Sequence, residues 1–364
     1  MTILVLANFG MGLFKFRKEL LEALINERHE VYLSLPHDDY VSALEKIGCK
    51  CVKTPVDRRG TNPLKDVRLL LKYIHLIRRI QPDVVLTYTI KPNVYGGIAC
   101  RITHKKYITN ITGLGTSVEN KGFIQKLSLA LYKIGLKKAS CIFFQNEPNK
   151  QLFMDRKMIK SKTRLIPGSG VNVSQYGFEP YPEDKEKINF LFIGRMMKAK
   201  GIDELLEAAK LVKMQYAHVH FDLVGGSEED YFQQLVEHEI LGIITYHGQQ
   251  KDVKPFIKRA HAIILPSHHE GMANVLLESA SSGRPVLASN VTGCIETFDD
   301  AISGISFEAK RVDCLVEAMV TFIKKPYEQK KAMGIAGRRK MEKVFDRRIV
   351  MNAYLEEIDN CKEN

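Results

Sequence analysis

The chain has 364 residues, 45% of them hydrophobic and 26% charged, and this length suggests two domains rather than one. No stretch approaches the roughly 20 apolar residues of a membrane-crossing helix, which excludes such a span. The start, Met1–Ala7, lacks the basic leader of a secretory signal and has the pattern of a buried strand. We therefore expect a cytoplasmic protein.

The seven cysteines are scattered, and no pair has zinc-ligand spacing, so we expect reduced thiols and no metal. The net charge of +12 is unevenly placed. Residues 1–180 carry 29 Lys and Arg against 14 Asp and Glu, whereas residues 181–364 carry 25 against 28. A basic first half indicates an anionic partner such as a phosphate-bearing substrate, an acidic lipid or a nucleic acid.

Short apolar runs alternate with amphipathic runs along the first half, which predicts parallel βαβ units. The predicted strands are Ile3–Ala7, Glu30–Leu35, Val84–Tyr88, Tyr107–Ile111 and Ser140–Phe144. The predicted helices between them are Phe14–Glu27, Asp66–Arg79 and Val94–Thr103.

The second half repeats this rhythm. Its predicted strands are Ile188–Ile193, Val219–Val224, Ile244–Tyr246, Ala262–Leu265 and Pro285–Ala288, and its predicted helices are Ile202–Lys213, Asp230–His238, Asn274–Ser282 and Val312–Lys324. The boundary is placed at Pro167–Gly170 and the polar stretch that follows. The predicted domains are residues 1–168, joined by a final helix within 346–364, and residues 169–345.

A glycine turn follows the first strand, where Asn8-Phe9-Gly10-Met11-Gly12 precedes the first helix. Glycines let the backbone approach a phosphate, and the dipole of the helix favours negative charge at its N-terminus. A tight turn without a ligand explains this feature equally well.

The second half opens with a basic turn, in which Arg195 and Lys200 flank the residues between a strand and a helix. Two cations beside a helix N-terminus can neutralise a diphosphate leaving group. A solvated basic turn is the simpler explanation of this feature taken alone.

Two carboxylates follow the strand Ala262–Leu265. Glu270 lies in the loop and Glu278 about two turns into the next helix, about 12 Å along its axis. That separation is too long for two carboxylates acting on one bond, as in glycosidases, and suits two ends of one long ligand. The backbone N–H groups of Gly271, Met272 and Ala273 are expected to be free between them. A capping glutamate and a surface glutamate are the alternative, although the apolar neighbours of Glu278 require it to have a partner.

With the basic turn and the two glutamates in order, each after a strand, the whole chain resembles the retaining glycosyltransferases of family 4. Their GT-B fold has two facing Rossmann-like domains with doubly wound parallel sheets, so an α/β protein is implied. The stretches Thr87–Gly96 and Asn110–Gly115 resemble a subgroup that builds bacterial capsules, exopolysaccharides and lipid-linked oligosaccharides. The resemblance also implies that the last helix, Phe345–Ile358, crosses back to the first domain.

The resemblance implies a nucleotide-sugar donor. It also implies a reaction without a metal, and the lack of an evident Asp-x-Asp motif fits this expectation. Arg195 and Lys200 would hold the donor diphosphate, Glu270 would face the hydroxyls of the donor sugar, and these three are the implied catalytic residues. Glu278 would hydrogen-bond the ribose. The full implied donor-binding set is Gly10, Gly12, Arg195, Lys200, Glu270, Gly271, Met272, Ala273, Asn274 and Glu278.

The implied acceptor-side residues are Lys91, Asn93, Asn110, Thr112 and Gly113. Many family members carry a histidine where this chain has Ile90, and Lys91 is the candidate to contribute in its place. The implied reaction is retaining transfer of a sugar, with a UDP-linked N-acetylamino sugar expected from the subgroup, to a lipid-linked saccharide. Because no carboxylate nucleophile is evident, we expect front-face attack, with charge on the leaving diphosphate stabilised electrostatically.

Residues 121–138 predict a basic, apolar helix, in which Phe123, Leu127, Leu131 and Ile134 share one face. This helix either lies on an anionic membrane, which would make the protein peripheral on the inner face of the plasma membrane, or packs on the first sheet.

Three rival functions remain to be weighed. A nucleotide-sugar epimerase of the same fold would use the same donor groups without an acceptor. A dinucleotide oxidoreductase fails because Lys15 stands where the third glycine of its fingerprint is required. Nucleic-acid binding lacks a helix-turn-helix, zinc or aromatic-platform signature, so no nucleic-acid partner is expected.

Overall fold

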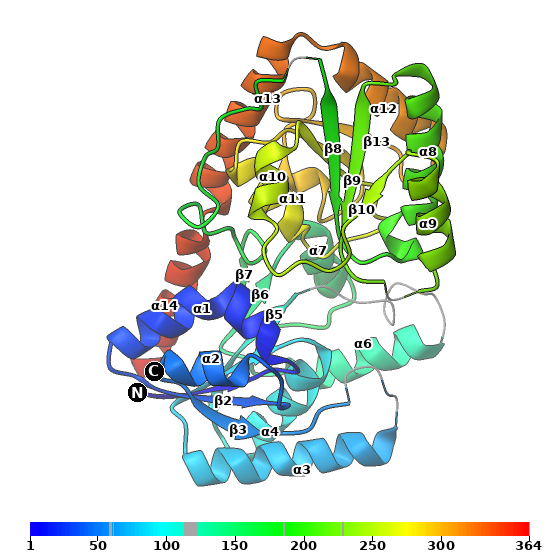
Figure 1. Cartoon of the computed structure of the whole chain (residues 1–364). Helices are drawn as coiled ribbons and strands as arrows, with labels where there is room; N and C mark the ends of the chain where they lie inside the picture. The colour runs from blue at the N-terminus through cyan, green and yellow to red at the C-terminus, as the bar shows by residue number, and fades with distance from the viewer. Residues whose placement is uncertain (58–59, 61, 113–122, 185, 228, 364) are drawn as a thin grey trace. The chain divides into compact units, whose positions relative to one another are not determined.

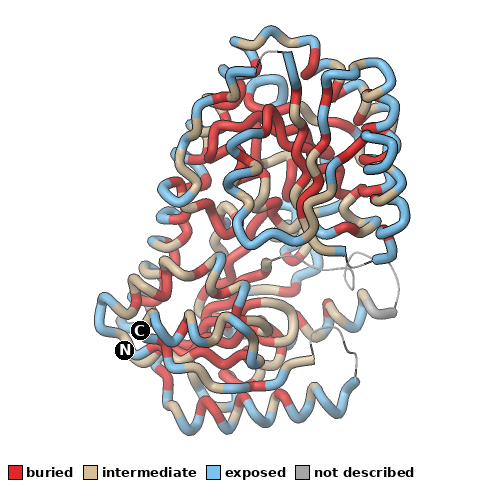
Figure 2. The backbone as a smooth tube through the Cα atoms, viewed as in Figure 1, coloured by how far each residue is buried: buried red, intermediate tan, exposed pale blue. Residues whose placement is uncertain are grey.

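The computed structural model describes residues 1–364 except for 58–59, 61, 113–122, 185, 228 and 364. The chain divides into two compact units, Met1–Ser169 with Arg348–Asn364, and Gly170–Arg347 (Figure 1). These limits lie within two residues of the predicted domain limits. Each unit is a parallel α/β sheet covered by helices, and the central strands of both sheets are largely buried (Figure 2).

The first unit has a seven-stranded parallel sheet in the order β3-β2-β1-β4-β5-β6-β7. Its strands are β1 (Thr2–Leu6), β2 (Glu30–Leu35), β3 (Lys50–Lys53), β4 (Val84–Tyr88), β5 (Lys106–Ile111), β6 (Cys141–Phe144) and β7 (Thr163–Leu165). Continuous apolar runs form the central strands because helices cover both faces of the sheet. Successive residues of β1 show this directly, since Ile3 and Val5 belong to one core cluster and Leu4 and Leu6 to the other.

The helices of the first unit form two layers. One layer contains α1 (Gly10–Asn26), α2 (Val41–Lys46) and the last helix, α14 (Arg347–Glu363). The other contains α3 (Pro63–Ile80), the π-helical turn η1 (Pro92–Gly96), α4 (Gly97–Ile102), α6 (Phe123–Gly135) and α7 (Glu147–Asp155). Helix α3 begins where it does because the Asn62 side chain accepts hydrogen bonds from the N–H groups of Leu64 and Lys65.

The predicted return of the C-terminal helix to the first unit is confirmed by contacts along α14. The buried Tyr354 packs against Phe143 of β6, with ring centroids 4.4 Å apart. The buried Glu357 accepts from Lys162 at 2.8 Å and from Arg164 at 2.9 Å. Apolar packing and a buried ion pair therefore hold α14 to the sheet.

The second unit has a six-stranded parallel sheet in the order β10-β9-β8-β11-β12-β13. Its strands are β8 (Ile188–Ile193), β9 (Val219–Val224), β10 (Thr245–Tyr246), β11 (Ala262–Leu265), β12 (Val286–Ser289) and β13 (Gly304–Phe307). Its helices are η2 (Lys198–Lys200), α8 (Ile202–Gln215), α9 (Phe232–Ile240), α10 (Lys254–Arg259), α11 (Asn274–Ser281), η3 (Ile295–Thr297), α12 (Val312–Lys324), α13 (Tyr327–Lys340) and η4 (Met341–Phe345). One large apolar core lies around this sheet.

Two predictions about where site residues lie on helices were wrong. Helix α1 begins at Gly10, so Gly10 and Gly12 lie in its first turn and not in a loop ahead of it. Helix α11 begins at Asn274 as predicted, but Glu278 is its fifth residue and therefore lies about one turn into the helix and not two.

Candidate active site

The site residues of the second unit lie where strands end. Arg195 follows β8, Lys200 closes the short helix η2, and Glu270 follows β11. Strands β8 and β11 are hydrogen-bonded neighbours, with Ala262 opposite Phe190. Carboxyl ends of parallel strands share one edge of a sheet, which is where ligands bind in doubly wound folds.

The structure brings Lys200 and Glu270 into direct contact. The Lys200 ammonium forms an ion pair with the Glu270 carboxylate, and the Ser267 hydroxyl donates to the same carboxylate oxygen at 2.8 Å. The side chains of Lys200 and Glu270 are only 20% and 12% exposed. Partial burial strengthens this interaction relative to a surface ion pair.

Glycines allow this contact by letting backbone segments approach closely. Gly201 has a φ of +72°, and a Cβ there would lie 2.1 Å from the Pro266 carbonyl oxygen. Gly293, with a φ of +85°, would place a Cβ 2.5 Å from the Glu270 carbonyl oxygen. The loops that carry Lys200 and Glu270 are therefore held by positions that only glycine fills without strain.

Glu278 has the partner that its surroundings require. The Tyr176 phenol is hydrogen-bonded to Glu278, and burial together with this carboxylate raises the pKa of Tyr176 well above its ordinary value. Arg195 is exposed at the carboxyl end of β8. The structure thus places Lys200 and Glu270 together, whereas Glu278 contacts Tyr176.

The prediction that three backbone N–H groups lie free before α11 was wrong for Ala273, whose N–H donates to the Gly293 carbonyl at 2.8 Å. Gly271 also has a partner. Met272 and Ala273 are buried. The Oδ1 atom of Asn274 is buried without a hydrogen-bond partner among the described residues, which leaves an acceptor available at the first residue of α11.

Sequence reasoning missed three residues that position this site. Ser267 is fully buried and holds Glu270, and Gly293 supports the Glu270 backbone. Cys294 is buried close enough to Glu270 that burial and this carboxylate raise the pKa of its thiol. A serine three residues before a loop glutamate is the one signal that the sequence offered.

In the first unit, the N-terminus of α1 is already capped by a carboxylate. Asp38 accepts from the N–H of Gly10 at 2.6 Å and from that of Met11 at 3.3 Å. A Cβ on Gly10 would lie 2.5 Å from the Asp38 carboxylate, and a Cβ on Gly12 would meet the Phe9 ring. The N-terminus of α1, where a phosphate was predicted to bind, does hold an anionic group, and in this structure that group is the Asp38 carboxylate.

Three of the predicted acceptor-side residues, Lys91, Thr112 and Gly113, lie in or next to the described part of the first unit. Lys91 is ion-paired with Asp66 at 2.6 Å, and Tyr95 donates to the other Asp66 oxygen at 2.9 Å. Thr112 follows β5 and is half-buried. Gly113 lies outside the described residues.

The prediction that Asn93 and Asn110 face an acceptor was wrong. Both are buried in the core, and the Asn93 amide donates to the Asn110 carbonyl at 2.8 Å, while the Asn110 amide donates to the Tyr354 hydroxyl. Because both side chains are buried, they do not face an acceptor, and the Asn93 Oδ1 atom has no hydrogen-bond partner among the described residues.

The described residues contain no group of three or more His, Cys, Asp and Glu placed to hold a metal ion. Among the same residues, no helix is both long and apolar enough to pass through a bilayer.

Comparisons with known proteins divide the chain as the structure does. A family model described as glycosyl transferase 4-like matches residues 2–146, and one described as glycosyl transferases group 1 matches residues 177–340. The chain belongs to the family 4 glycosyltransferases.

Their GT-B fold is confirmed here by similarity to solved structures. The chain superposes on Anabaena Alr3699/HepE, crystallised with UDP and glucose, with a TM-score of 0.80 at 18% identity over 99% of this chain and 100% of that chain. A glycosyltransferase from Rickettsia africae gives a TM-score of 0.81 at 20% identity, over 100% and 99% of the two chains.

The names of two curated relatives of this glycosyltransferase describe enzymes that act on lipid-linked saccharides. The chain is 24% identical to the N,N'-diacetylbacillosaminyl-diphospho-undecaprenol alpha-1,3-N-acetylgalactosaminyltransferase of Campylobacter jejuni, over 100% of both chains. It is 25% identical to the UDP-Gal:alpha-D-GlcNAc-diphosphoundecaprenol alpha-1,3-galactosyltransferase of Escherichia coli, over 85% of this chain and 84% of that one.

Proposed function

We propose that this glycosyltransferase moves a sugar, with retention of configuration, from a UDP-sugar to a lipid-linked saccharide in capsule, exopolysaccharide or surface glycan assembly. An N-acetylamino sugar is the proposed donor sugar, and the Campylobacter relative supports it by name. The observation that carries the proposal is the Lys200–Glu270–Ser267 cluster at the carboxyl ends of neighbouring strands. In this proposal the Lys200 cation binds the diphosphate, and the neighbouring Glu270 carboxylate binds the sugar.

In the proposed reaction, Lys200 and Arg195 stabilise the negative charge that grows on the leaving UDP. Glu270 accepts hydrogen bonds from hydroxyls of the donor sugar, and Glu278 accepts from the ribose. The acceptor hydroxyl attacks the anomeric carbon from the face that UDP leaves, and its proton passes to the departing diphosphate. No metal is required by this scheme, so we expect a chelator to leave turnover unchanged.

We further propose that the protein works in the cytoplasm as a peripheral protein on the inner face of the plasma membrane, with no nucleic-acid partner. A membrane-anchored acceptor supports this location. Lys91, together with Thr112 and Gly113 after β5, remains a proposed acceptor-side contact.

A direct assay tests the reaction. Purified protein is incubated with a panel of UDP-hexoses and UDP-N-acetylhexosamines and with short-chain polyisoprenyl-diphosphate saccharides, and the product linkage is assigned by NMR. We expect one donor to give an α-linked product in the presence of acceptor. Isomerised donor formed without acceptor would favour the epimerase alternative, and a β-linked product would contradict retention.

A further inference from the structure

The positive charge of the chain is concentrated in one segment. Residues 63–138 carry 14 Lys and Arg against three Asp and Glu, an excess of 11 in a chain whose net charge is +12. This segment contains α3, β4, η1, α4, β5 and α6, and its helices form most of one of the two layers on the first sheet. Most of the excess charge of the chain thus lies in the segment that contains these helices.

The same layer exposes aliphatic side chains. Leu64, Val67 and Leu71 of α3 are 73%, 53% and 59% exposed, at a spacing that places them along one side of the helix. Ile102 of α4 and Leu127 and Ile134 of α6 are each about half exposed. Of the residues predicted to share one face of α6, Leu127 and Ile134 are exposed, whereas Leu131 packs against the core. Leu129, Tyr132 and Leu136 are buried in that core.

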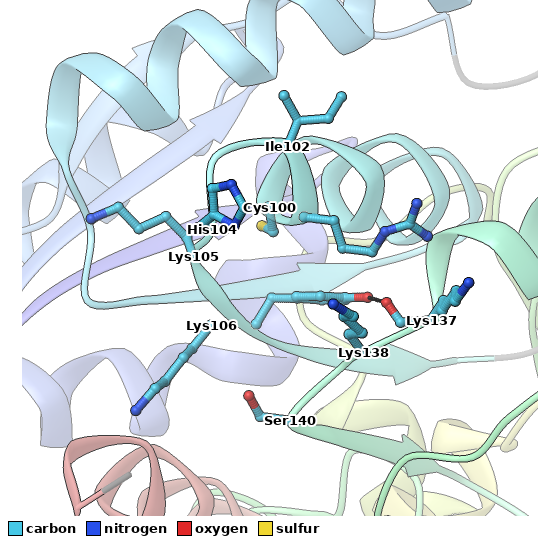
Figure 3. A pocket seen from close by; sticks show the side chains of 10 residues that line it. Cys100, Ile102, His104, Lys105, Lys106, Lys137, Lys138 and Ser140 are labelled. Atoms are coloured by element: carbon cyan, nitrogen blue, oxygen red, sulfur yellow. Dashed lines mark hydrogen bonds between the residues drawn. The ribbon is translucent and has the colours of Figure 1, made fainter.

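A basic groove of about 500 Å³ opens where α4 and α6 end. Figure 3 shows the side chains that line it, among them His104, Lys105, Lys106, Lys137 and Lys138. None of the described residues that line the groove is acidic. The groove offers several cations and the exposed Ile102 in one place, without a carboxylate to neutralise them.

Short contacts fix the walls of the groove. The Arg101 guanidinium donates to the Ile134 carbonyl at 2.5 Å, which ties the end of α4 to the end of α6. The Tyr107 hydroxyl lies 2.8 Å from the Gly135 carbonyl and 2.7 Å from the Lys137 carbonyl. The Lys106 ammonium donates to the Cys361 carbonyl at 2.8 Å. Lys137 and Lys138 are exposed and Lys105 is half-buried, and the ammonium groups of all three line the groove.

The simplest alternative is that these cations cap helix C-termini, whose dipole favours positive charge. That explanation accounts for Arg101, which does bind a terminal carbonyl of α6. It does not account for the remaining cations, or for aliphatic side chains exposed on three helices of the same layer. A nucleic-acid surface would require phosphates to lie against those aliphatic side chains, whereas a bilayer interface accepts both groups.

We infer that the layer formed by α3, α4 and α6 docks on an anionic phospholipid membrane, with the groove at the ends of α4 and α6 binding headgroup phosphates. The inference rests on the proposed function, because a membrane-anchored acceptor requires the enzyme at the bilayer. Helices α3 and α6 each start at the carboxyl edge of the sheet and run toward its other edge. A bilayer along these helices therefore passes beside the strand ends, where an acceptor would enter.

A charge-matched pair of variants tests this surface. One variant combines Lys105→Gln, Lys137→Gln and Lys138→Gln at the groove. The control combines Lys210→Gln, Lys324→Gln and Lys331→Gln, three exposed lysines of the second unit. Flotation with phosphatidylcholine vesicles, with and without phosphatidylglycerol, measures binding of the full chain. Each lysine near an anionic surface strengthens binding about fivefold.

We expect the wild type to bind only the vesicles that contain phosphatidylglycerol, and less so at high salt. The groove variant should bind them about a hundredfold more weakly, and the control should resemble the wild type. Ile134→Ser should weaken binding severalfold without unfolding the chain, because this side chain is half exposed. Equal losses in the groove and control variants, or a wild type that binds RNA and no vesicle, would overturn the inference.

A second readout separates this inference from the proposed function. Transfer to a water-soluble acceptor with a shortened lipid should be unchanged in the groove variant, since none of its residues contacts the proposed substrates. Failure of the wild type in that assay would count against the proposed reaction. Normal transfer combined with unaltered vesicle binding by the groove variant would count against the docking surface alone.

Discussion

The Lys200 ammonium and the Glu270 carboxylate neutralise one another at the edge of the second sheet. The two groups are proposed to hold different parts of the donor, the diphosphate and the sugar. Lys200 must therefore share its charge between Glu270 and the incoming diphosphate, and Ser267 keeps the carboxylate in place while it does so. The contact orients both groups before the donor arrives.

Lys200→Ala and Arg195→Ala should lower turnover by a similar factor but differ in their effect on stability. Loss of one group that stabilises a leaving anion typically costs about 10²–10³ in rate. Lys200→Ala also leaves a largely buried carboxylate without its cation, at a cost of about 1–3 kcal/mol in the free energy of unfolding. Arg195 is exposed, so water screens the interactions that it makes, and its removal should cost less stability than that of Lys200.

Turnover with saturating donor and thermal unfolding of both variants check this prediction, with the exposed Lys210→Ala as control. Near-normal turnover of the Lys200 and Arg195 variants would refute their assignment to the diphosphate.

Asp38→Ala should destabilise the first unit and open the N-terminus of α1. Asp38 accepts two N–H groups of the first turn, and loss of a helix cap costs about 0.5–2 kcal/mol. The same change removes a carboxylate from an anion-binding position, so a phosphate-bearing substrate should bind more tightly. Asp38→Asn keeps an acceptor without the charge and should lose less stability.

Denaturant unfolding and the KM values for donor and acceptor measure both effects of Asp38. Unchanged KM values for both substrates would show that neither places a phosphate at α1.

The hold of α14 on the first unit should weaken in acid. Burial acts to raise the pKa of Glu357, but hydrogen bonds from Lys162 and Arg164 outweigh it and hold the pKa below its ordinary value of 4.5. The folded chain thus binds this proton more weakly than the unfolded chain does. The stabilisation is therefore fully present above pH 4.5 and is lost as the pH falls through the lower folded value.

Unfolding of the wild type and of Glu357→Gln, followed from pH 7 to pH 3, tests whether the contribution of Glu357 to stability falls in acid. The difference in stability between the two proteins should be largest near neutral pH and should shrink in acid. A difference that grows as the pH falls would contradict the assignment to this carboxylate.

The sequence predicted the central strands because their long apolar runs are buried on both faces. It did not predict β3, where lysines begin and end a short edge strand, Lys50–Lys53. The resemblance to a subgroup assigned Asn93 and Asn110 to the acceptor, but a motif of residue types does not distinguish an asparagine that faces a ligand from one that bonds a buried partner. The sequence could not show that Asp38 caps α1, since this contact joins residues 28 apart in sequence that follow different strands.

Gly201→Ala should inactivate the enzyme through the backbone. Gly201 combines a left-handed φ of +72° with a Cβ position 2.1 Å from the Pro266 carbonyl, so an alanine there must move the turn that carries Lys200. Gly242 is the matched control, because its φ is +65° and a Cβ there meets nothing within 4 Å. Both variants should lose the roughly 1 kcal/mol that a left-handed non-glycine residue costs.

Only Gly201→Ala should add a steric loss, and only it should lower turnover toward the level of Lys200→Ala. Thermal unfolding and turnover of both variants, measured side by side, separate the cost of the left-handed backbone from the cost of the steric clash. If both alanine variants were equally active and equally stable, the close approach of η2 to the end of β11 would not be what sets the position of Lys200.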